Sequence, residues 1–252
     1  MIRVPSLIRS CPEGEHCPVE PALAVLAPAG PVRAVALVLH GGSAEDHRAV
    51  GRFAPPYLRM VPFARALRRR GGCVAVWSLR HRHRGWNAPH LHPVQDARWA
   101  LAEIRREHPD VPVALVGHSM GGRTALRVAG EPQVVAVCAL APWVEEGEPC
   151  EQLAGRAVLI AHGDRERTTD PRQSYRYAVR AKRVTDRVAR FAVLGDGHAM
   201  LLRAGDWTRL VTDFALGELG VRPVAPRVAE AMAAPAPAGL DVPLDGKRRG
   251  GR

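Results

Sequence analysis

Residues 117–121, which read GHSMG, could carry nucleophilic chemistry. They follow the apolar run 113–116 and precede a helical pattern, so they are expected at a sharp turn from a strand into a helix. Such a turn pushes the hydroxyl of Ser119 clear of the backbone. It also requires small residues at both ends of the motif, because a Cβ there would clash. Ser119 is therefore the candidate nucleophile, and the alternative is an ordinary glycine-rich turn that contains a serine.

A serine hydroxyl is a poor nucleophile at neutral pH, so it needs a base to accept its proton and an acid to orient that base. The candidate base is His198, one of eleven histidines in the chain. It follows the apolar run 188–194 in the sequence GDGHAM, and a loop flanked by glycine lets an imidazole swing toward Ser119. We therefore expect His198 to accept the proton.

The acid is expected in the loop after the apolar run 157–161. That loop reads HGDRERTTDP, and three carboxylates compete for the role, namely Asp164, Glu166 and Asp170. The residue pattern alone leaves the choice among them open.

The elements that must position these residues alternate along the chain. Apolar runs at 33–39, 73–79, 111–116, 134–140, 157–161 and 188–194 predict buried strands, and helical spacing is found at 57–70, 93–108, 120–130, 171–183 and 206–219. Strands that are apolar on both faces and alternate with helices predict a mostly parallel sheet with helices on both faces. The site should then lie beyond the carboxyl ends of the strands.

The two ends of the chain differ from this pattern. Residues 1–32 are irregular apart from one β-like piece at 23–26, and we expect them to belong to a single domain that spans residues 1–220. Residues 221–252 are rich in Pro, Ala and Gly and end in basic residues, so we expect a disordered tail. The segment 141–156 is too short for an independent helical cap.

The net charge of +11, from 36 Lys and Arg against 25 Asp and Glu, raises the question of a nucleic-acid partner. The arginines are scattered, however, and no basic block is interleaved with aromatic residues. We expect no specific nucleic-acid partner, and a polyanion-binding protein remains a competing reading. No run approaches the ~20 apolar residues of a membrane-spanning helix.

The five cysteines form no CxxC pair, which argues against a disulfide framework and a zinc ribbon. Cys11, His16 and Cys17 have no partner ligands elsewhere in the sequence pattern, so we expect no metal. The N-terminus also has no apolar segment typical of a secretory signal, and we therefore expect a cytoplasmic protein with reduced thiols.

Over residues 33–219 the chain resembles the α/β-hydrolase superfamily, in which the serine, the acid and the histidine follow in this order. Members often read H-G-x-x-D in the acid loop, and residues 162–166 read HGDRE here. The resemblance therefore implies that Glu166 is the acid, with Asp164 as the alternative. It also implies the α/β-hydrolase fold, with a minimal cap or none.

An acyl-transfer site needs N–H donors aimed at the developing oxyanion. One donor is expected to be the backbone N–H of Met120, which follows the nucleophile. The HGG sequence at residues 40–42 resembles the oxyanion loop of the superfamily. This resemblance implies the N–H of Gly42 as the second donor, with Ser43 as the alternative.

These residues together predict a serine hydrolase that uses no cofactor and cleaves a carboxylic ester of a small or medium acyl substrate. The alternatives are an acyl thioesterase with the same three residues and a catalytically silent binding protein with the same fold.

Two features bear on the substrate of such an enzyme. Arg80, Arg82 and Arg84 follow the strand 73–79 and could attract an anionic acyl group, although a solvated loop with Asp96 as an ion-pair partner is the simpler interpretation. Trp143 is expected at the rim of the pocket.

Overall fold

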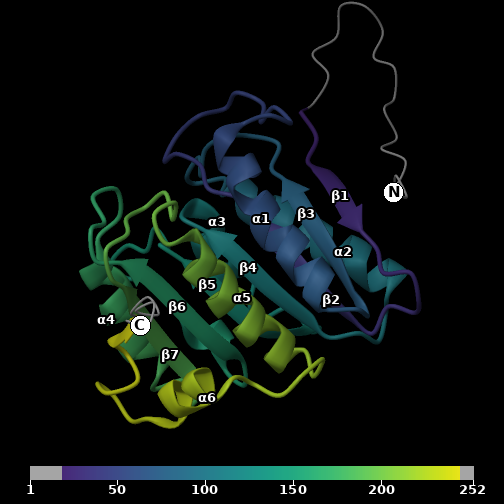
Figure 1. The fold of residues 1–252 in the computed structure, drawn as a ribbon. Coiled ribbons are helices and arrows are strands. Elements are labelled where there is room, and N and C mark those ends of the chain that lie inside the picture. The colour runs from purple at the N-terminus through teal and green to yellow at the C-terminus, as the bar shows by residue number, and fades with distance from the viewer. Residues whose placement is uncertain (1–18, 245–252) are drawn as a thin grey trace, which may run out of the picture.

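The computed structural model describes residues 19–244, and these build one twisted sheet of eight strands (Figure 1). The strand order is β1-β3-β2-β4-β5-β6-β7-β8. Only β1 runs antiparallel to its neighbour, β3, while the other pairs are parallel. The strands are β1 Ala22–Leu26, β2 Ala34–Leu39, β3 Val74–Arg80, β4 Val113–His118, β5 Val134–Leu140, β6 Ala157–Gly163, β7 Val188–Val193 and β8 Val242–Leu244.

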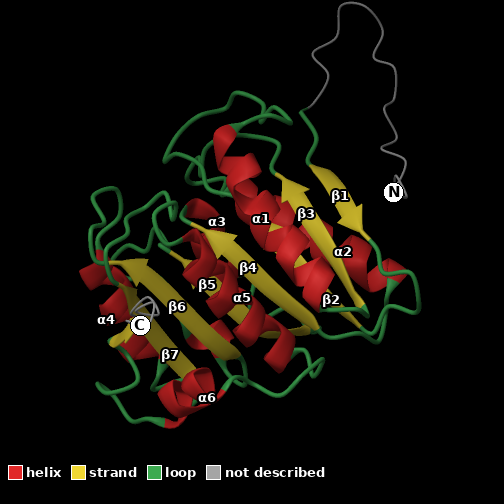
Figure 2. Cartoon of the chain, viewed as in Figure 1, coloured by secondary structure: helices red, strands yellow, loops and turns green. Residues whose placement is uncertain are grey.

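Helices cover both faces of this sheet, as the sequence predicts (Figure 2). One face is covered by α1, α5 and α6, and the other by α2, α3 and α4. The helices are α1 Pro55–Arg70, α2 His92–Glu107, α3 Met120–Arg127, α4 Pro171–Ala181, α5 Ala204–Glu218 and α6 Pro226–Ala233. The predicted α/β-hydrolase fold, with a mostly parallel sheet, is confirmed.

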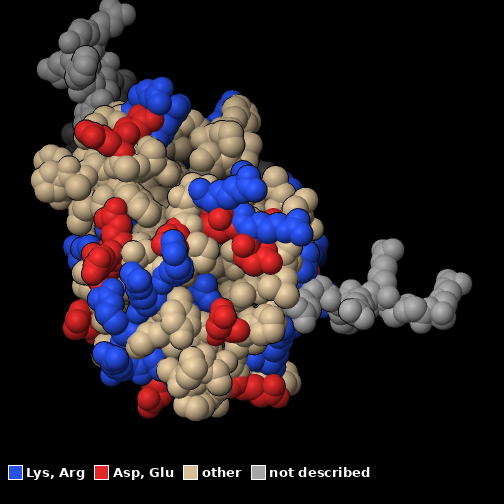
Figure 3. All heavy atoms as spheres, turned by 90° about the vertical axis from the view of Figure 1, so that its left-hand side faces the viewer, with Lys and Arg blue, Asp and Glu red and all other residues tan. Residues whose placement is uncertain are grey.

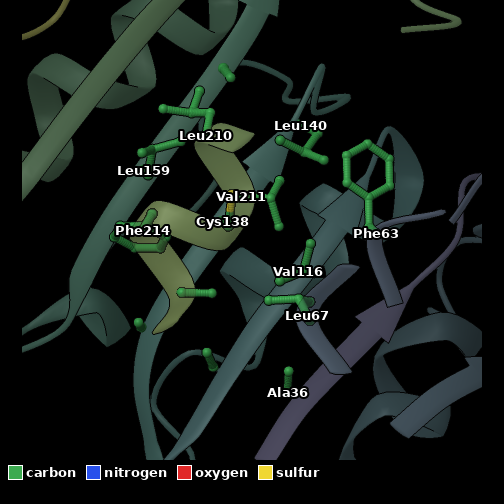
Figure 4. Packing of buried hydrophobic residues seen from close by; sticks show 14 of the residues in the cluster. Ala36, Phe63, Leu67, Val116, Cys138, Leu140, Leu159, Leu210, Val211 and Phe214 are labelled. Atoms are coloured by element: carbon green, nitrogen blue, oxygen red, sulfur yellow. The ribbon is translucent and has the colours of Figure 1, made fainter. Parts of the chain in front are cut away.

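Apolar side chains on both faces of the strands hold the layers together. All six residues of β2 are buried, because helices pack on each side of it. Figure 4 shows the face under α1 and α5, where Phe63, Leu67, Val211 and Phe214 lie over the strands. Burial of one such side chain contributes about 1.5–3 kcal/mol.

The parallel arrangement brings the loops of interest to one edge of the sheet. The carboxyl ends of β2, β4, β6 and β7 lie at this edge, and their loops carry the HGG sequence, Ser119, Glu166 and His198. The segment between β5 and β6 holds only the short 3₁₀ turn Glu151–Leu153, so no large cap is inserted there.

The C-terminal segment was expected to be a disordered tail, and for residues 226–244 this prediction was wrong. Helix α6 buries Val228 and Met232 against the core, and β8 pairs with β7. The guanidinium of Arg190 in β7 also binds the Asp241 carboxylate at 2.8 Å. The Pro- and Ala-rich composition suggested disorder, although residues 226–233 form one short amphipathic helix. Residues 245–252 lie outside the described part of the chain.

At the N-terminal end, the β-like piece at 23–26 is part of strand β1, on the edge of the sheet. Cys11, His16 and Cys17 lie outside the described residues. Within residues 19–244, no helix is both long enough and apolar enough to cross a bilayer.

Figure 3 shows positive and negative side chains interspersed on one face of the molecule. This face therefore carries no continuous positive field of the kind that binds a polyanion.

The packing of α6 leads to a test of the C-terminal segment. Met232→Asp places a carboxyl group in the core and should lower the free energy of unfolding by about 2–4 kcal/mol, measured by urea denaturation. The matched control is Ala229→Asp on the exposed side of α6, which should change it by less than about 0.5 kcal/mol. Equal, small effects of both variants would mean that α6 does not pack as described.

Candidate active site

Ser119 stands at the tight turn between β4 and α3, in a strained backbone conformation. Its φ is 54° and its ψ is −117°, a conformation that costs on the order of 1–3 kcal/mol. A Cβ at Gly117 would collide with the carbonyl of Gly121, and a Cβ at Gly121 would collide with the carbonyl of Leu39. The two glycines of the motif are therefore required by the close approach of the backbone, as the sequence predicts.

His198 lies in the loop that follows β7, and two buried side chains hold the backbone of this loop. The carboxylate of Asp196 accepts hydrogen bonds from the N–H of Arg203 at 2.8 Å and from Nε1 of Trp207 at 3.0 Å. Nε2 of His118 lies 2.9 Å from the carbonyl oxygen of His198. Burial and the nearby His198 lower the pKa of His118 to about 3, so the His118 ring is neutral and donates this bond through Nε2.

Glu166 makes direct contact with His198. Its Oε2 lies 2.8 Å from Nδ1 of His198, and its Oε1 accepts the N–H groups of Arg167 at 2.8 Å and Thr168 at 2.6 Å. The carboxylate is fully buried. Burial alone would raise its pKa, but the hydrogen bonds from His198 and from the Thr168 N–H outweigh burial and lower the pKa to about 2. The ionised group therefore holds a proton on Nδ1 of His198 and leaves Nε2 free.

The two competing carboxylates of this loop have other partners. Asp164 is exposed and accepts the N–H of Gly195 at 2.7 Å. Asp170 caps α4 by accepting the N–H of Arg172 at 2.9 Å. Among the described residues neither one contacts His198, whereas Glu166 does.

The candidate nucleophile and the candidate base are linked through His118, without a hydrogen bond between them. The ring of His118, the residue before Ser119, has its centroid 4.7 Å from that of His198. Within residues 19–244, no hydrogen bond joins the hydroxyl of Ser119 to the His198 imidazole. Such bonds are often long in a free enzyme and tighten when substrate binds.

The HGG sequence after β2 lies directly beside this turn. A Cβ on Gly41 would lie 3.2 Å from Cβ of Ser119, and a Cβ on Gly42 would lie 2.6 Å from Cε of Met120. In the described part of the chain, the N–H groups of Gly42 and Met120 donate to no acceptor. The N–H of Ser43 instead donates to the carbonyl of Arg84 at 3.0 Å, so this alternative donor is already engaged.

The arginines at the end of β3 and in the loop after it are bound mostly by the protein itself. Arg80 donates to the carbonyl of Val50 at 2.6 Å, and Arg82 pairs with Asp96 at 2.5 Å. Arg84 is exposed and donates to the carbonyl of Ala49 at 3.1 Å. These bonds favour a role in holding the loop over the attraction of an anionic substrate.

Trp143 lies next to the candidate nucleophile, and its backbone N–H donates to the carbonyl of Ser119 at 3.2 Å. Its half-buried ring packs 4.7 Å from the guanidinium of Arg123, which also lies over the ring of Trp86. This stacking fixes the orientation of the Trp143 ring, while the place of Trp143 at the rim of a substrate pocket stays a prediction.

Two histidines of the site were missed by sequence reasoning. His118 occupies a position that the G-x-S-x-G pattern leaves free, and His162 begins the HGDRE sequence. Nδ1 of His162 contacts Oγ of Ser174 at 2.9 Å, and its Nε2 lies 3.7 Å from Oε2 of Glu166. Burial lowers the pKa of His162 to about 3, so this ring adds no charge beside the carboxylate.

Comparisons with known proteins agree with this architecture. The sequence matches the alpha/beta hydrolase family over residues 36–247. No curated protein matches the chain in sequence.

Three solved structures are similar in fold. A lidless α/β serine hydrolase from Xanthomonas campestris is 19% identical, with a TM-score of 0.59, over 82% of this chain and 91% of that one. The esterase Est2 from Thermogutta terrifontis is 17% identical, with a TM-score of 0.61, over 82% of this chain and 90% of that one. Est1E from Butyrivibrio proteoclasticus, solved with ferulic acid bound, is 15% identical, with a TM-score of 0.60. The match covers 79% of this chain and 96% of that one.

The buried carboxylate leads to a prediction about stability and pH. Because the pKa of Glu166 falls from its ordinary value of 4.5 to about 2 on folding, its ionised form stabilises the fold above pH 4.5. Glu166→Gln should therefore be less stable than the unaltered protein at pH 7 in urea denaturation, and the difference should shrink as the pH falls from 4.5 toward 2. The exposed Glu146→Gln is the control and should show no such trend. A difference that stays constant from pH 7 to about pH 3 would contradict the assignment.

Proposed function

The chain belongs to the alpha/beta hydrolase family, and from this premise we propose that it is a serine hydrolase acting on carboxylic esters. The proposed substrate is an ester of a small or medium acyl group, which passes through an acyl-enzyme on Ser119. The observation that carries the proposal is the 2.8 Å contact between Nδ1 of His198 and the buried carboxylate of Glu166. It leaves Nε2 of His198 as the free base of a loop packed beside Ser119.

In the first half of the reaction, Oγ of Ser119 attacks the carbonyl carbon of the ester while Nε2 of His198 accepts its proton. The negative charge of Glu166 stabilises the resulting imidazolium. The N–H groups of Gly42 and Met120 donate to the oxyanion, and each such donor contributes about 3 kcal/mol to transition-state stabilisation. When the tetrahedral intermediate collapses, His198 returns the proton to the leaving alkoxide. An alcohol departs and the acyl group remains on Ser119.

In the second half, water attacks the acyl carbon and gives a proton to Nε2 of His198. Collapse of this second intermediate breaks the bond to Oγ of Ser119, which takes the proton back. The carboxylic acid leaves and the free enzyme is restored. The charge on Glu166 is unchanged throughout, because its pKa of about 2 keeps it ionised beside the imidazolium.

The short segment between β5 and β6 supports an open site that accepts dissolved esters. This segment holds only a 3₁₀ turn, and one similar structure is described as lacking a lid. Feruloyl esters are a suitable first substrate class, because ferulic acid binds to the similar Est1E. A thioester passes through the same tetrahedral intermediate, so thioesterase activity is the second candidate.

The proposal predicts covalent labelling of one serine. A fluorophosphonate probe should form an adduct with Ser119 that is detected by peptide mass spectrometry, because the probe mimics the tetrahedral intermediate. The matched control is Ser119→Ala, which should show no adduct at this peptide. A folded, unaltered protein that is not labelled would instead indicate a catalytically silent binding protein.

The role of Glu166 predicts a separate kinetic effect. Glu166→Gln should lower kcat by about 10²–10⁴-fold, because the neutral amide no longer stabilises the imidazolium. The assay uses p-nitrophenyl and feruloyl esters beside acyl-CoA thioesters, and higher kcat/KM is expected for the esters. Asp164→Asn is the matched control and should retain kcat within about tenfold. A larger loss in Asp164→Asn than in Glu166→Gln would transfer the role of the acid to Asp164.

A further inference from the structure

Three histidines that are distant in the sequence meet outside the candidate active site. His47 lies between β2 and α1, His83 lies between β3 and α2, and His92 is the first residue of α2. A ring nitrogen of each histidine lies within 4.8 Å of those of the other two. The ring centroids are 4.7–5.6 Å apart, and the ring planes meet at 63–83°. The rings therefore meet edge to face around a common space.

We propose that His47, His83 and His92 form a binding site for one divalent transition-metal ion of the Zn²⁺ class. Imidazole nitrogen is a preferred ligand of such ions, and three histidines with one water complete a tetrahedral shell. Zn–N bonds of about 2.0–2.1 Å place the nitrogens of such a shell ~3.4 Å apart. The nitrogens start within 4.8 Å of one another, so side-chain rotations can bring them to this spacing.

Backbone hydrogen bonds hold the two loops of the site together. The N–H of Arg84 donates to the carbonyl of Arg48 at 3.0 Å, and the N–H of Gly85 donates to the carbonyl of Asp46 at 2.9 Å. A Cβ on Gly85 would collide with the N–H of Asp46, so the two segments touch along their backbones. The loops that carry His47 and His83 thus form a paired, preorganised scaffold, which reduces the cost of ordering the ligands.

Two observations concern the rings of His83 and His92. The side chain of Asn87 accepts the N–H of Asp46 at 2.8 Å, and its Nδ2 lies 3.3 Å from Nδ1 of His92. Nδ1 of His83 is buried and has no hydrogen-bond partner in the described part of the chain. A buried polar atom without a partner is unusual, and a metal ion or a metal-bound water would supply one.

Two of the three arginines near the cluster pair with carboxylates, while Arg84 donates to the carbonyl of Ala49. The guanidinium of Arg48 pairs with Asp46 at 2.7 Å, and that of Arg82 pairs with the buried Asp96 at 2.5 Å. These carboxylates offset the repulsion that two free arginines would exert on a cation.

A bound ion would connect the proposed oxyanion loop to the rest of the molecule. His47 and Gly42 share the loop between β2 and α1, and Ser43 in this loop bonds to the carbonyl of Arg84. The ion would therefore join this loop to the segment between β3 and α2 and stabilise both. Metal binding itself does not depend on the proposed esterase activity.

The test is zinc titration of the tag-free, full-length protein by isothermal titration calorimetry after treatment with EDTA. A Cys11→Ser/Cys17→Ser background removes the thiols of the N-terminal segment as competing ligands. We expect one Zn²⁺ per chain with micromolar or tighter affinity. Saturating Zn²⁺ should also raise the Tm by several degrees, because the ion binds the folded state.

Single variants identify the ligands. His83→Gln and His92→Gln should each weaken zinc binding at least tenfold and remove the Tm shift. The matched control is His90→Gln. His90 is exposed and its ring centroid lies 5.4 Å from that of His92, but it is not one of the three proposed zinc ligands. Unfolding curves without zinc show whether each variant is folded. If a variant is not, the visible spectrum of Co²⁺ bound to the unaltered protein tests for a tetrahedral site directly.

Three results would overturn the proposal. The first is the absence of stoichiometric zinc binding. The second is affinity that is unchanged in both His83→Gln and His92→Gln. The third is binding of inorganic phosphate in place of zinc, with loss in the same variants, which would make the cluster an anion site.

Discussion

The close packing of backbone at residues 117–121 is the constraint on which the rest of the site depends. Gly117 lets the turn fold back against Gly121, Gly121 lets it approach the end of β2, and Ser119 between them has a positive φ. The strain of about 1–3 kcal/mol persists only because the surrounding structure opposes its relief. The buried strand β4 leads into the turn, and the end of the buried strand β2 lies against it at Gly121, so both strands oppose that relief.

A buried negative charge organises the opposite side of the site. Ionised Glu166 is kept in the interior by N–H groups of its own loop and by His198, so its burial is compensated by hydrogen bonds. The backbone around His198 is held independently, by Asp196 and by His118. The same principle applies to two buried arginines, since Arg123 pairs with the buried Glu148 and Arg190 pairs with Asp241.

The loops at the carboxyl edge of the sheet are coupled to one another through their backbones. The loop between β2 and α1 carries Gly42 beside the nucleophile and His47 at its far side. Backbone hydrogen bonds join this loop to the segment between β3 and α2, which carries His83. His47 of the histidine cluster and Gly42 therefore share one loop, which these hydrogen bonds join to the segment between β3 and α2.

The sequence by itself determined the alternation of strands and helices, the turn at Ser119 and the placement of His198 after β7, because periodicity, glycine spacing and chain order are local properties. The residue pattern alone left Asp164, Glu166 and Asp170 open, and the family resemblance implied Glu166. Among the described residues, the tertiary structure joins only Glu166 of these three to His198. Helix α6 and the meeting of His47, His83 and His92 were also beyond sequence reasoning. Contacts between distant loops depend on how the strands are ordered in the sheet, and no local sequence pattern encodes that order.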